Sequence, residues 1–253
     1  MIARIAALAR VRATMALHPI TAILGPRQCG KTTLAGFLAA ERPCEVFDLE
    51  DPVDRRRLEA PLQTLSTATG VVIIDEVQRQ PELFEILRVL VDRPASIQKY
   101  LLLGSASPSL VRGASESLAG RIGFVDLSGF DLWEVGVEER DRLWLRGGFP
   151  RSFLASDDQA SAQWRADFAR TFLERDIPQL GITVPAETLR RFWTMLAHYH
   201  GQVWNAAELA RSLGSSEHTV RRYLDILAGA FMVRVLPPRF ENLAKRQVKA
   251  PKV

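Results

Sequence analysis

The 253-residue sequence is poor in several features that mark specialised classes of protein. It has only two cysteines, Cys29 and Cys44, which excludes a disulfide-stapled scaffold, and neither has the spacing of a metal ligand. No apolar run approaches the ~20 residues that a membrane-spanning helix needs. These absences predict an ordinary globular protein of the reducing cytoplasm, with no membrane partner.

Negative charge is missing from both ends of the chain. No Asp or Glu precedes Glu41, and every charged side chain from Lys245 onward is positive. The formal net charge is only +4, which permits a nucleic-acid partner without requiring one.

Strand-like and helical segments alternate up to about residue 130. Apolar runs of strand length occur at residues 20–24, 45–49, 71–74, 100–103 and 122–127, and helical stretches at residues 33–41, 83–90 and 109–119. The runs VVIID and YLLLG are continuously apolar, as parallel strands buried on both faces are. This pattern predicts an α/β domain with a parallel sheet over residues 1–130.

After residue 130 the pattern is helical. Aromatic residues recur at four-residue spacing from Trp164, which predicts a helical, lid-like segment over residues 131–200. From Asn205, two helices separated by a Gly-Ser-Ser turn precede the apolar run FMVRVL, residues 231–236, and a double proline. This order predicts a winged helix-turn-helix over residues 201–253.

The segment GPRQCGKT matches the phosphate-binding pattern G-x-x-x-x-G-K-[ST] in full. Its glycines allow backbone amides to turn inward, and the following helix adds its positive N-terminal end. Lys31 would reach the β- and γ-phosphates, the Thr32 hydroxyl would hold Mg²⁺, and Thr33 would lie on the α-phosphate side. The pattern predicts a site for ATP and Mg²⁺ formed by Gly25, Pro26, Arg27, Gln28, Cys29, Gly30, Lys31, Thr32 and Thr33.

Two acidic residues follow the third apolar run, in VVIIDEVQ. Asp75 and Glu76 stand at the carboxyl end of a strand, where parallel sheets bind their ligands. Asp75 would hold the Mg²⁺ through water, and Glu76 would polarise the attacking water as general base. The alternative is a solvated acidic loop after a core strand.

Two further residues are candidates for a part in catalysis. Ser105, in LLLGSASP, would position the attacking water, or else it simply ends a strand. Arg121, in SESLAGRIGF, would stabilise transition-state charge on the nucleotide of a neighbouring subunit, which requires a homo-oligomer. A salt bridge at a helix end is the equal alternative for Arg121, and Arg112 is the reserve candidate.

Five segments together carry a family resemblance. GPRQCGKT, VFDLEDP, VVIIDEVQ, LLLGSASPSL and ESLAGRIGFVDLSGFDLWE resemble the AAA-type P-loop ATPases. More narrowly, the chain is similar to a widespread prokaryotic group whose ATPase domain is followed by a helical segment with GGFP and LERDI motifs. Members of that group continue with a winged helix and a C-terminal nuclease-like domain. Here GGFP occupies residues 147–150 and LERDI residues 173–177.

The resemblance implies ATP binding with slow hydrolysis. It also implies that the C-terminal domain is absent here. In the group a run like NLAKRQVKAPKV leads into that domain, whereas this sequence stops at Val253.

Two functions of different classes fit these residues. One is a Mg²⁺-dependent ATPase whose turnover drives a conformational change. The other is a nucleotide-gated binding protein with negligible turnover, in which ATP holds one shape and the winged helix grips DNA or a protein. Glu76 favours the enzyme. A small-molecule kinase fits less well, because the chain has a winged helix where such kinases bind the acceptor.

The second helix of the helix-turn-helix, residues 217–227, would bury Val220, Leu224 and Leu227. Its other side would expose four residues suited to phosphate and base-edge contacts with DNA: His218, Thr219, Arg221 and Arg222. Two acidic residues dilute this face, and docking of a neighbouring subunit is the alternative use.

The basic tail carries Lys245, Arg246, Lys249 and Lys252. Its low apolar content predicts a mobile linker, unless it pairs with the wing. The alternative is a basic arm that binds nucleic-acid phosphates.

Overall fold

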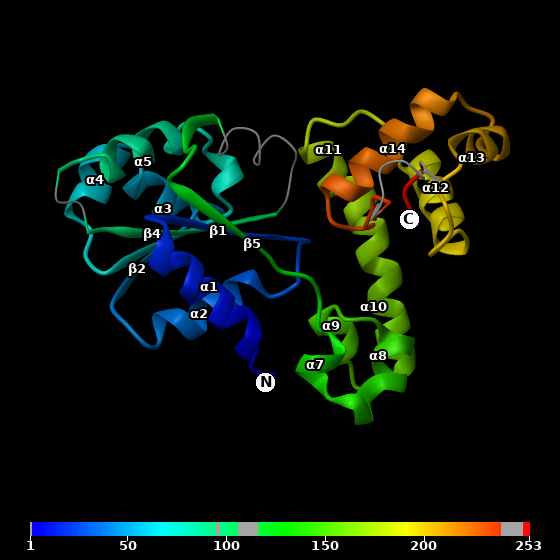
Figure 1. Cartoon of the computed structure of the whole chain (residues 1–253), viewed down its shortest axis with the longest axis horizontal. Helices are drawn as coiled ribbons and strands as arrows, with labels where there is room; N and C mark the ends of the chain where they lie inside the picture. Colours follow the sequence, from blue (N-terminus) through cyan, green and yellow to red (C-terminus); the bar gives the residue numbers. More distant parts are fainter. Residues whose placement is uncertain (1, 95–96, 106–115, 239–249) are drawn as a thin grey trace, which may run out of the picture. The chain divides into compact units, whose positions relative to one another are not determined.

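The computed structural model describes residues 2–94, 97–105, 116–238 and 250–253 (Figure 1). The chain divides into two compact units, Met1–Trp164 and Arg165–Val253. Across the ranges that the structure describes, no helix combines the length and the apolar character needed to cross a bilayer.

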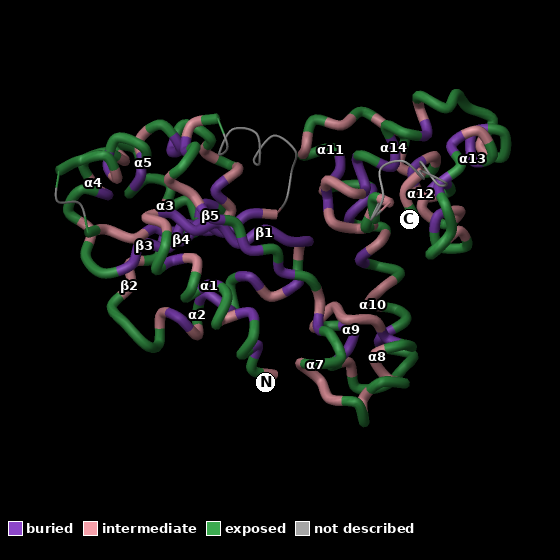
Figure 2. Tube along the Cα trace, viewed as in Figure 1, coloured by how far each residue is buried: buried purple, intermediate pink, exposed green. Residues whose placement is uncertain are grey.

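The first unit is built on a parallel five-stranded sheet. Its strands are β1 Ile20–Gly25, β2 Cys44–Asp48, β3 Val71–Asp75, β4 Lys99–Ser105 and β5 Ile122–Asp126. Their order is β2-β3-β4-β1-β5, and every residue of β1 and β3 is buried (Figure 2). Strands covered on both faces need mainly apolar side chains, which is why the sequence pattern located the inner strands β1, β3 and β4, whereas the outer strands β2 and β5 keep exposed residues.

Helices cover both faces of this sheet (Figure 1). α1 Ile5–Leu17 and α2 Lys31–Ala39 lie on one face, and α3 Pro52–Arg57, α4 Pro61–Thr67 and α5 Leu83–Val91 lie on the other. Val11 of α1 and Leu34 of α2 join Ile23 and Leu101 of the sheet in one buried core. The helix predicted over residues 109–119 falls largely outside the described residues, and its described end is helical only at residues 116–117.

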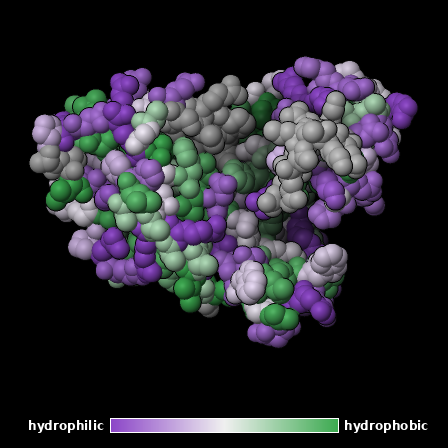
Figure 3. Space-filling model, in the orientation of Figure 1, coloured by the Kyte–Doolittle hydropathy of each residue, from purple (hydrophilic) through white to green (hydrophobic). Residues whose placement is uncertain are grey.

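Short helices follow the last strand. They are α7 Leu132–Val135, the 3-10 turn η2 Val137–Glu139, α8 Arg140–Arg146, α9 Pro150–Phe153 and α10 Asp158–Thr171. Asp131 and Glu134 form a capping box that begins α7. Trp133 and Trp144 are 95% and 91% exposed on α7 and α8, where Figure 3 shows hydrophobic side chains among hydrophilic ones.

The second unit is helical. It contains the π-helical turn η3 Phe172–Asp176, α11 Ile177–Gln179, α12 Ala186–His198, α13 Ala206–Leu213 and α14 Glu217–Gly229. Phe192 of α12 packs at its centre, edge-on to Tyr223 at 5.7 Å and to Trp204 at 6.4 Å between ring centroids. Gly214 ends α13 in a left-handed conformation, and the Ser216 side chain caps α14. The helix pair of the predicted helix-turn-helix is therefore formed.

The described structure has no strand over residues 231–236, where the predicted wing needs one, so the winged part of the helix-turn-helix is not confirmed. Phe231 has a positive φ of 60°, and the Met232 amide donates to the Leu227 carbonyl at 2.9 Å. These features make the chain turn back at the end of α14, so the backbone of the run FMVRVL does not start as an extended strand. Among the described residues, the run is bridged at Leu236, by two hydrogen bonds with Lys252 of 2.8 and 2.9 Å.

The last three residues of the chain are paired with the body of the second unit. Lys252 bridges both Leu236 and Val203, and its neighbours in sequence bond the backbone of residues 201–204. The tail is predicted to be mobile unless it pairs with the wing, and at residues 251–253 it is the pairing that is found, because Lys252 bonds Leu236 at the end of the run FMVRVL. The other three cations of the tail lie outside the described residues.

Candidate functional site

The loop between β1 and α2 has the backbone of an anion-binding turn. Gln28 and Gly30 adopt left-handed conformations, with φ of 62° and 96°. Turns of this kind direct successive N–H groups into one concavity, and α2 begins at its edge. At Gly25 no side chain fits, because a Cβ there would lie 2.1 Å from the Leu127 carbonyl oxygen.

The ammonium group of Lys31 is buried against this loop. Lys31 is 6% exposed, and its Nζ donates to the carbonyl oxygens of Gly25 at 3.1 Å and Pro26 at 2.9 Å. A buried cation needs such partners. Phosphate oxygens entering the loop would offer the same ammonium a charged and therefore stronger acceptor.

The two residues assigned to Mg²⁺ are in direct contact. The Thr32 hydroxyl donates to Asp75 Oδ2 at 2.6 Å, and Asp75 Oδ1 accepts from the Glu76 amide at 2.8 Å. Burial raises the pKa of the Asp75 carboxyl, and the Thr32 hydrogen bond opposes that rise. Within the described ranges no group of three or more His, Cys, Asp or Glu could hold a metal. These residues fit Mg²⁺, which typically takes one or two carboxylates together with phosphate oxygens.

Glu76 stands at the end of β3 beside Ser105 at the end of β4. Glu76 has a left-handed backbone, with φ of 54°, and begins the 3-10 turn η1 Val77–Arg79. Its Oε2 accepts hydrogen bonds from Ser105 Oγ at 2.9 Å and from Gln78 Nε2. Sequence reasoning missed Gln78, because no motif marks a glutamine two residues after the acidic pair.

A carboxylate links the loop to the turn that follows β3. Glu50 Oε1 accepts from Arg27 in the loop at 3.0 Å and from Arg79 in η1 at 2.9 Å. The backbone beside it is fixed to β3, because the Leu49 amide donates to the Asp75 carbonyl at 3.2 Å. Glu50 and Arg79 therefore border the loop, although the sequence pattern gave them no role.

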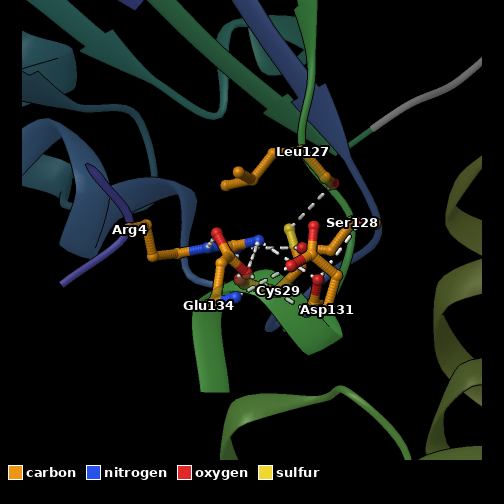
Figure 4. A network of polar contacts seen from close by, with 7 residues as sticks. Arg4, Cys29, Leu127, Ser128, Asp131 and Glu134 are labelled. Atoms are coloured by element: carbon orange, nitrogen blue, oxygen red, sulfur yellow. Dashed lines mark hydrogen bonds and ion pairs between the residues drawn. The ribbon is translucent and has the colours of Figure 1, made fainter. Parts of the chain in front are cut away.

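Arg4 reaches the loop at Cys29 and also contacts Ser128 and Glu134 (Figure 4). Its guanidinium donates to the carbonyl oxygens of Cys29 at 3.1 Å and Ser128 at 2.9 Å, and forms a two-pronged ion pair with Glu134 at 2.8 and 2.9 Å. Both ion-pair side chains are nearly inaccessible, at 7% and 6% exposure. Arg4 thus joins the loop, the segment after β5 and α7.

The Cys29 thiol is part of this packing. It is fully buried and donates to the Leu127 carbonyl at 3.5 Å. Burial raises the pKa of the Cys29 thiol in spite of the nearby charges of Lys31 and Arg4. A thiol in this state is a small packing group and no nucleophile.

The GGFP segment lies beside the loop. A Cβ built on Gly30 would lie 3.9 Å from the Pro150 side chain. The Phe130 amide donates to the Gly148 carbonyl at 2.6 Å, an approach too close for a side chain at Gly129. These small residues allow the chain to return to the loop after α8.

Arg121 is not brought to this site. It lies at the amino ends of the strands, away from the loop, where its carbonyl accepts a hydrogen bond from the Ile20 amide at the start of β1. Its guanidinium forms two hydrogen bonds with Asp92, of 2.6 and 2.7 Å. Arg121 therefore cannot serve the site of its own chain, and its action on a neighbouring subunit stays a proposal. Arg112 lies outside the described residues.

On α14, the residues assigned to DNA lie away from its buried face. Val220, Leu224 and Leu227 are buried as predicted. His218, Arg221 and Arg222 are exposed, and Thr219 is half-buried where its hydroxyl meets that of Ser216. Arg221 pairs with Glu217 of the same helix at 3.6 Å.

Comparison with protein families assigns both parts of the sequence. Residues 17–136 match the family described as "AAA domain". The chain carries an AAA-type P-loop domain. Residues 137–253 match a second family, described as "Domain of unknown function (DUF8612)", which begins where the AAA domain ends.

Curated relatives share both domains. Over 247 residues the chain is 53% identical to the uncharacterized proteins Rv2008c of Mycobacterium tuberculosis and Mb2031c of Mycobacterium bovis. The match covers 98% of this chain and 56% of each relative, so the chain spans little more than half of their length.

A solved structure shares the fold of the AAA domain and the helices that follow it. The Walker-type ATPase PABY2304 of Pyrococcus abyssi matches with a TM-score of 0.65 at 16% identity. The match covers 100% of this chain and 93% of that protein.

Proposed function

We propose that the protein is a Mg²⁺-dependent ATPase that couples nucleotide hydrolysis to a conformational change. One observation carries the proposal: beside the phosphate-binding loop, hydrogen bonds of 2.6, 2.8 and 2.9 Å connect Thr32, Asp75, Glu76 and Ser105 in series. The chain thus has a hydroxyl and a carboxylate suited to a metal next to a second carboxylate suited to a water. Binding alone would need only the first pair.

Each group has a distinct task in this proposal. Lys31 and the loop amides hold the β- and γ-phosphates, and Thr32 and Asp75 hold the metal. Bound Mg²⁺ supplies neutralisation of the charge shared by the two phosphates. Glu76 takes the proton of the attacking water, and Ser105 holds the Glu76 carboxylate in place.

The competing function, a nucleotide-gated switch with negligible turnover, uses the same loop. The switch would be favoured if the hydrogen bonds from Gln78 and Ser105 to Glu76 Oε2 kept Glu76 from accepting a proton. Phosphate release at saturating ATP and Mg²⁺ separates the two functions. Many turnovers per chain support the ATPase, and stoichiometric binding without continued release supports the switch.

Lys31→Ala is expected to weaken ATP binding at least tenfold, about 1.4 kcal/mol or more, because the loop loses its buried cation. Isothermal titration with ATP and Mg²⁺ measures this. Lys99→Ala is the matched control, because the Lys99 ammonium donates to the His18 carbonyl at the amino ends of the strands, away from the loop. If a folded Lys31→Ala protein binds ATP as tightly as the parent, the assignment of this loop to nucleotide binding is excluded.

We propose DNA as the partner of the helix-turn-helix. Simultaneous replacement of Arg221 and Arg222 by Ala is expected to weaken DNA binding and to reduce its salt slope by about 2, roughly one unit for each lost phosphate contact. Fluorescence anisotropy at several salt concentrations measures both quantities. Arg190→Ala is the control, because Arg190 is paired with acidic residues on α12 and η3. An unchanged slope accompanied by a lower solution mass would assign this face to subunit contacts instead.

A further inference from the structure

A carboxamide stands between the two residues assigned to the hydrolytic step. Gln78 Nε2 donates to Glu76 Oε2 and lies 3.1 Å from Ser105 Oγ. Ser105 Oγ donates to the same Glu76 oxygen at 2.9 Å. The three side chains therefore form a closed triangle between the turn after β3 and the end of β4.

Both donors converge on one oxygen of the carboxylate. Among the residues that the structure describes, no donor engages the other oxygen, Glu76 Oε1. A carboxylate held in this way has one oxygen committed to orientation and one available to accept a proton. The left-handed backbone of Glu76 is a sparsely populated conformation for a residue other than glycine, of the kind that clusters at functional sites.

The orientation of the Gln78 amide follows from the same contacts. Its Nε2 must face Glu76, since its oxygen would be repelled by the carboxylate. Its Oε1 is buried and has no hydrogen-bond partner in the described structure. The Nε2 end of the amide is therefore the end that contacts Glu76 and Ser105.

We propose that Gln78 is a positioning residue for the general base of ATP hydrolysis, an inference that rests on the proposed ATPase function. Together with Ser105 it fixes Glu76 Oε2, so that Oε1 takes the proton. In this step the water oxygen forms a bond to the γ-phosphorus, and the bond from that phosphorus to the ADP oxygen breaks. The water proton passes to Glu76 Oε1, while Gln78 neither gains nor loses a proton.

In the described structure the side-chain hydrogen bonds of Gln78 go to Glu76 and Ser105 and not to the phosphate-binding loop, which separates its role from nucleotide binding. Gln78→Met keeps the length of the side chain and removes the donor. It is expected to lower kcat about 10- to 100-fold, the loss typical of a hydrogen bond to a charged group, and to leave the ATP affinity unchanged. Gln78→Glu, which places a second carboxylate against Glu76, is expected to lower kcat further.

Gln80 provides the matched control. It is a second partly buried glutamine with an unpartnered Oε1, but its Nε2 donates to the Leu58 carbonyl at 3.4 Å and not to Glu76. Gln80→Met therefore removes an equivalent amide without touching the base. It is expected to keep the parental kcat, which a general packing effect at this turn would not allow.

The decisive measurement is a double-mutant cycle between Gln78→Met and Glu76→Gln, with phosphate release, ATP titration and thermal unfolding recorded for each protein. If Gln78 acts through Glu76, Gln78→Met slows the parent but causes no further loss in the Glu76→Gln protein. Independent, multiplying losses, or a parental rate in folded Gln78→Met and Gln78→Glu proteins, would overturn the role of Gln78 and leave the ATPase standing. A parent without turnover above that of Glu76→Gln would overturn both.

Discussion

Glu76→Gln is expected to bind ATP as tightly as the parent and to hydrolyse it about 10²- to 10⁴-fold more slowly, the usual contribution of a general base. The amide oxygen can still accept from Ser105 and Gln78, so the local geometry survives, but an amide cannot take the proton of the attacking water. Steady-state phosphate release and isothermal titration on the same preparation measure the two halves of this expectation.

Glu45→Gln is the control for loss of one acidic group. Glu45 lies on β2 and pairs with Arg57 on the surface, so its replacement should leave both turnover and affinity intact. A parental rate in the Glu76→Gln protein would exclude Glu76 as the base. A loss of ATP affinity would instead assign its carboxylate to nucleotide or metal binding.

Arg4→Ala is expected to lower the free energy of unfolding by about 3–5 kcal/mol, the cost of breaking a buried ion pair by removing one partner. The change leaves Glu134 only 6% exposed with no cation, and it takes a donor from the Cys29 and Ser128 carbonyls. Urea-induced unfolding followed by circular dichroism gives the difference. Weaker ATP binding should accompany it, because Cys29 belongs to the loop.

Arg12, on the helix α1 that follows Arg4, supplies a control for this prediction. Arg12 pairs with Glu41, but these side chains are 42% and 39% exposed, so Arg12→Ala should cost only about 0–1 kcal/mol. Equal, small losses for the two variants would show that the Arg4 pair contributes no more than a surface pair.

The parts of the AAA domain that sequence reasoning located are those with a strong local cause. The inner strands are mainly apolar because both of their faces are covered, and the loop needs glycine at Gly25, where its backbone approaches Leu127. The carboxyl edge of a parallel sheet then places Asp75 near Thr32. Each of these inferences uses neighbours in sequence or a general rule of sheets.

The parts that it missed depend on contacts that leave no local mark. Arg4 is one of several arginines near the N-terminus, and it is distinguished by contacts far along the chain, with Cys29, Ser128 and Glu134. Gln78 acquires its meaning from Ser105 on another strand. The strand expected at residues 231–236 had the right composition, but the left-handed Phe231 turns the chain first.

The ion pair between Arg4 and Glu134 also bears on the order in which parts of the nucleotide site form during translation. Arg4 and Glu134 are 130 positions apart, so a growing polypeptide presents the arginine and the loop long before their common partner is synthesised. Domains generally fold as units during synthesis, and long-range contacts require their intervening chain. A nascent chain halted before Glu134 would therefore contain the whole GPRQCGKT segment without the ion pair that holds Arg4 against it. The ion pair of Arg4 with Glu134 can form only after translation has passed beyond β5, which precedes Glu134 in the sequence.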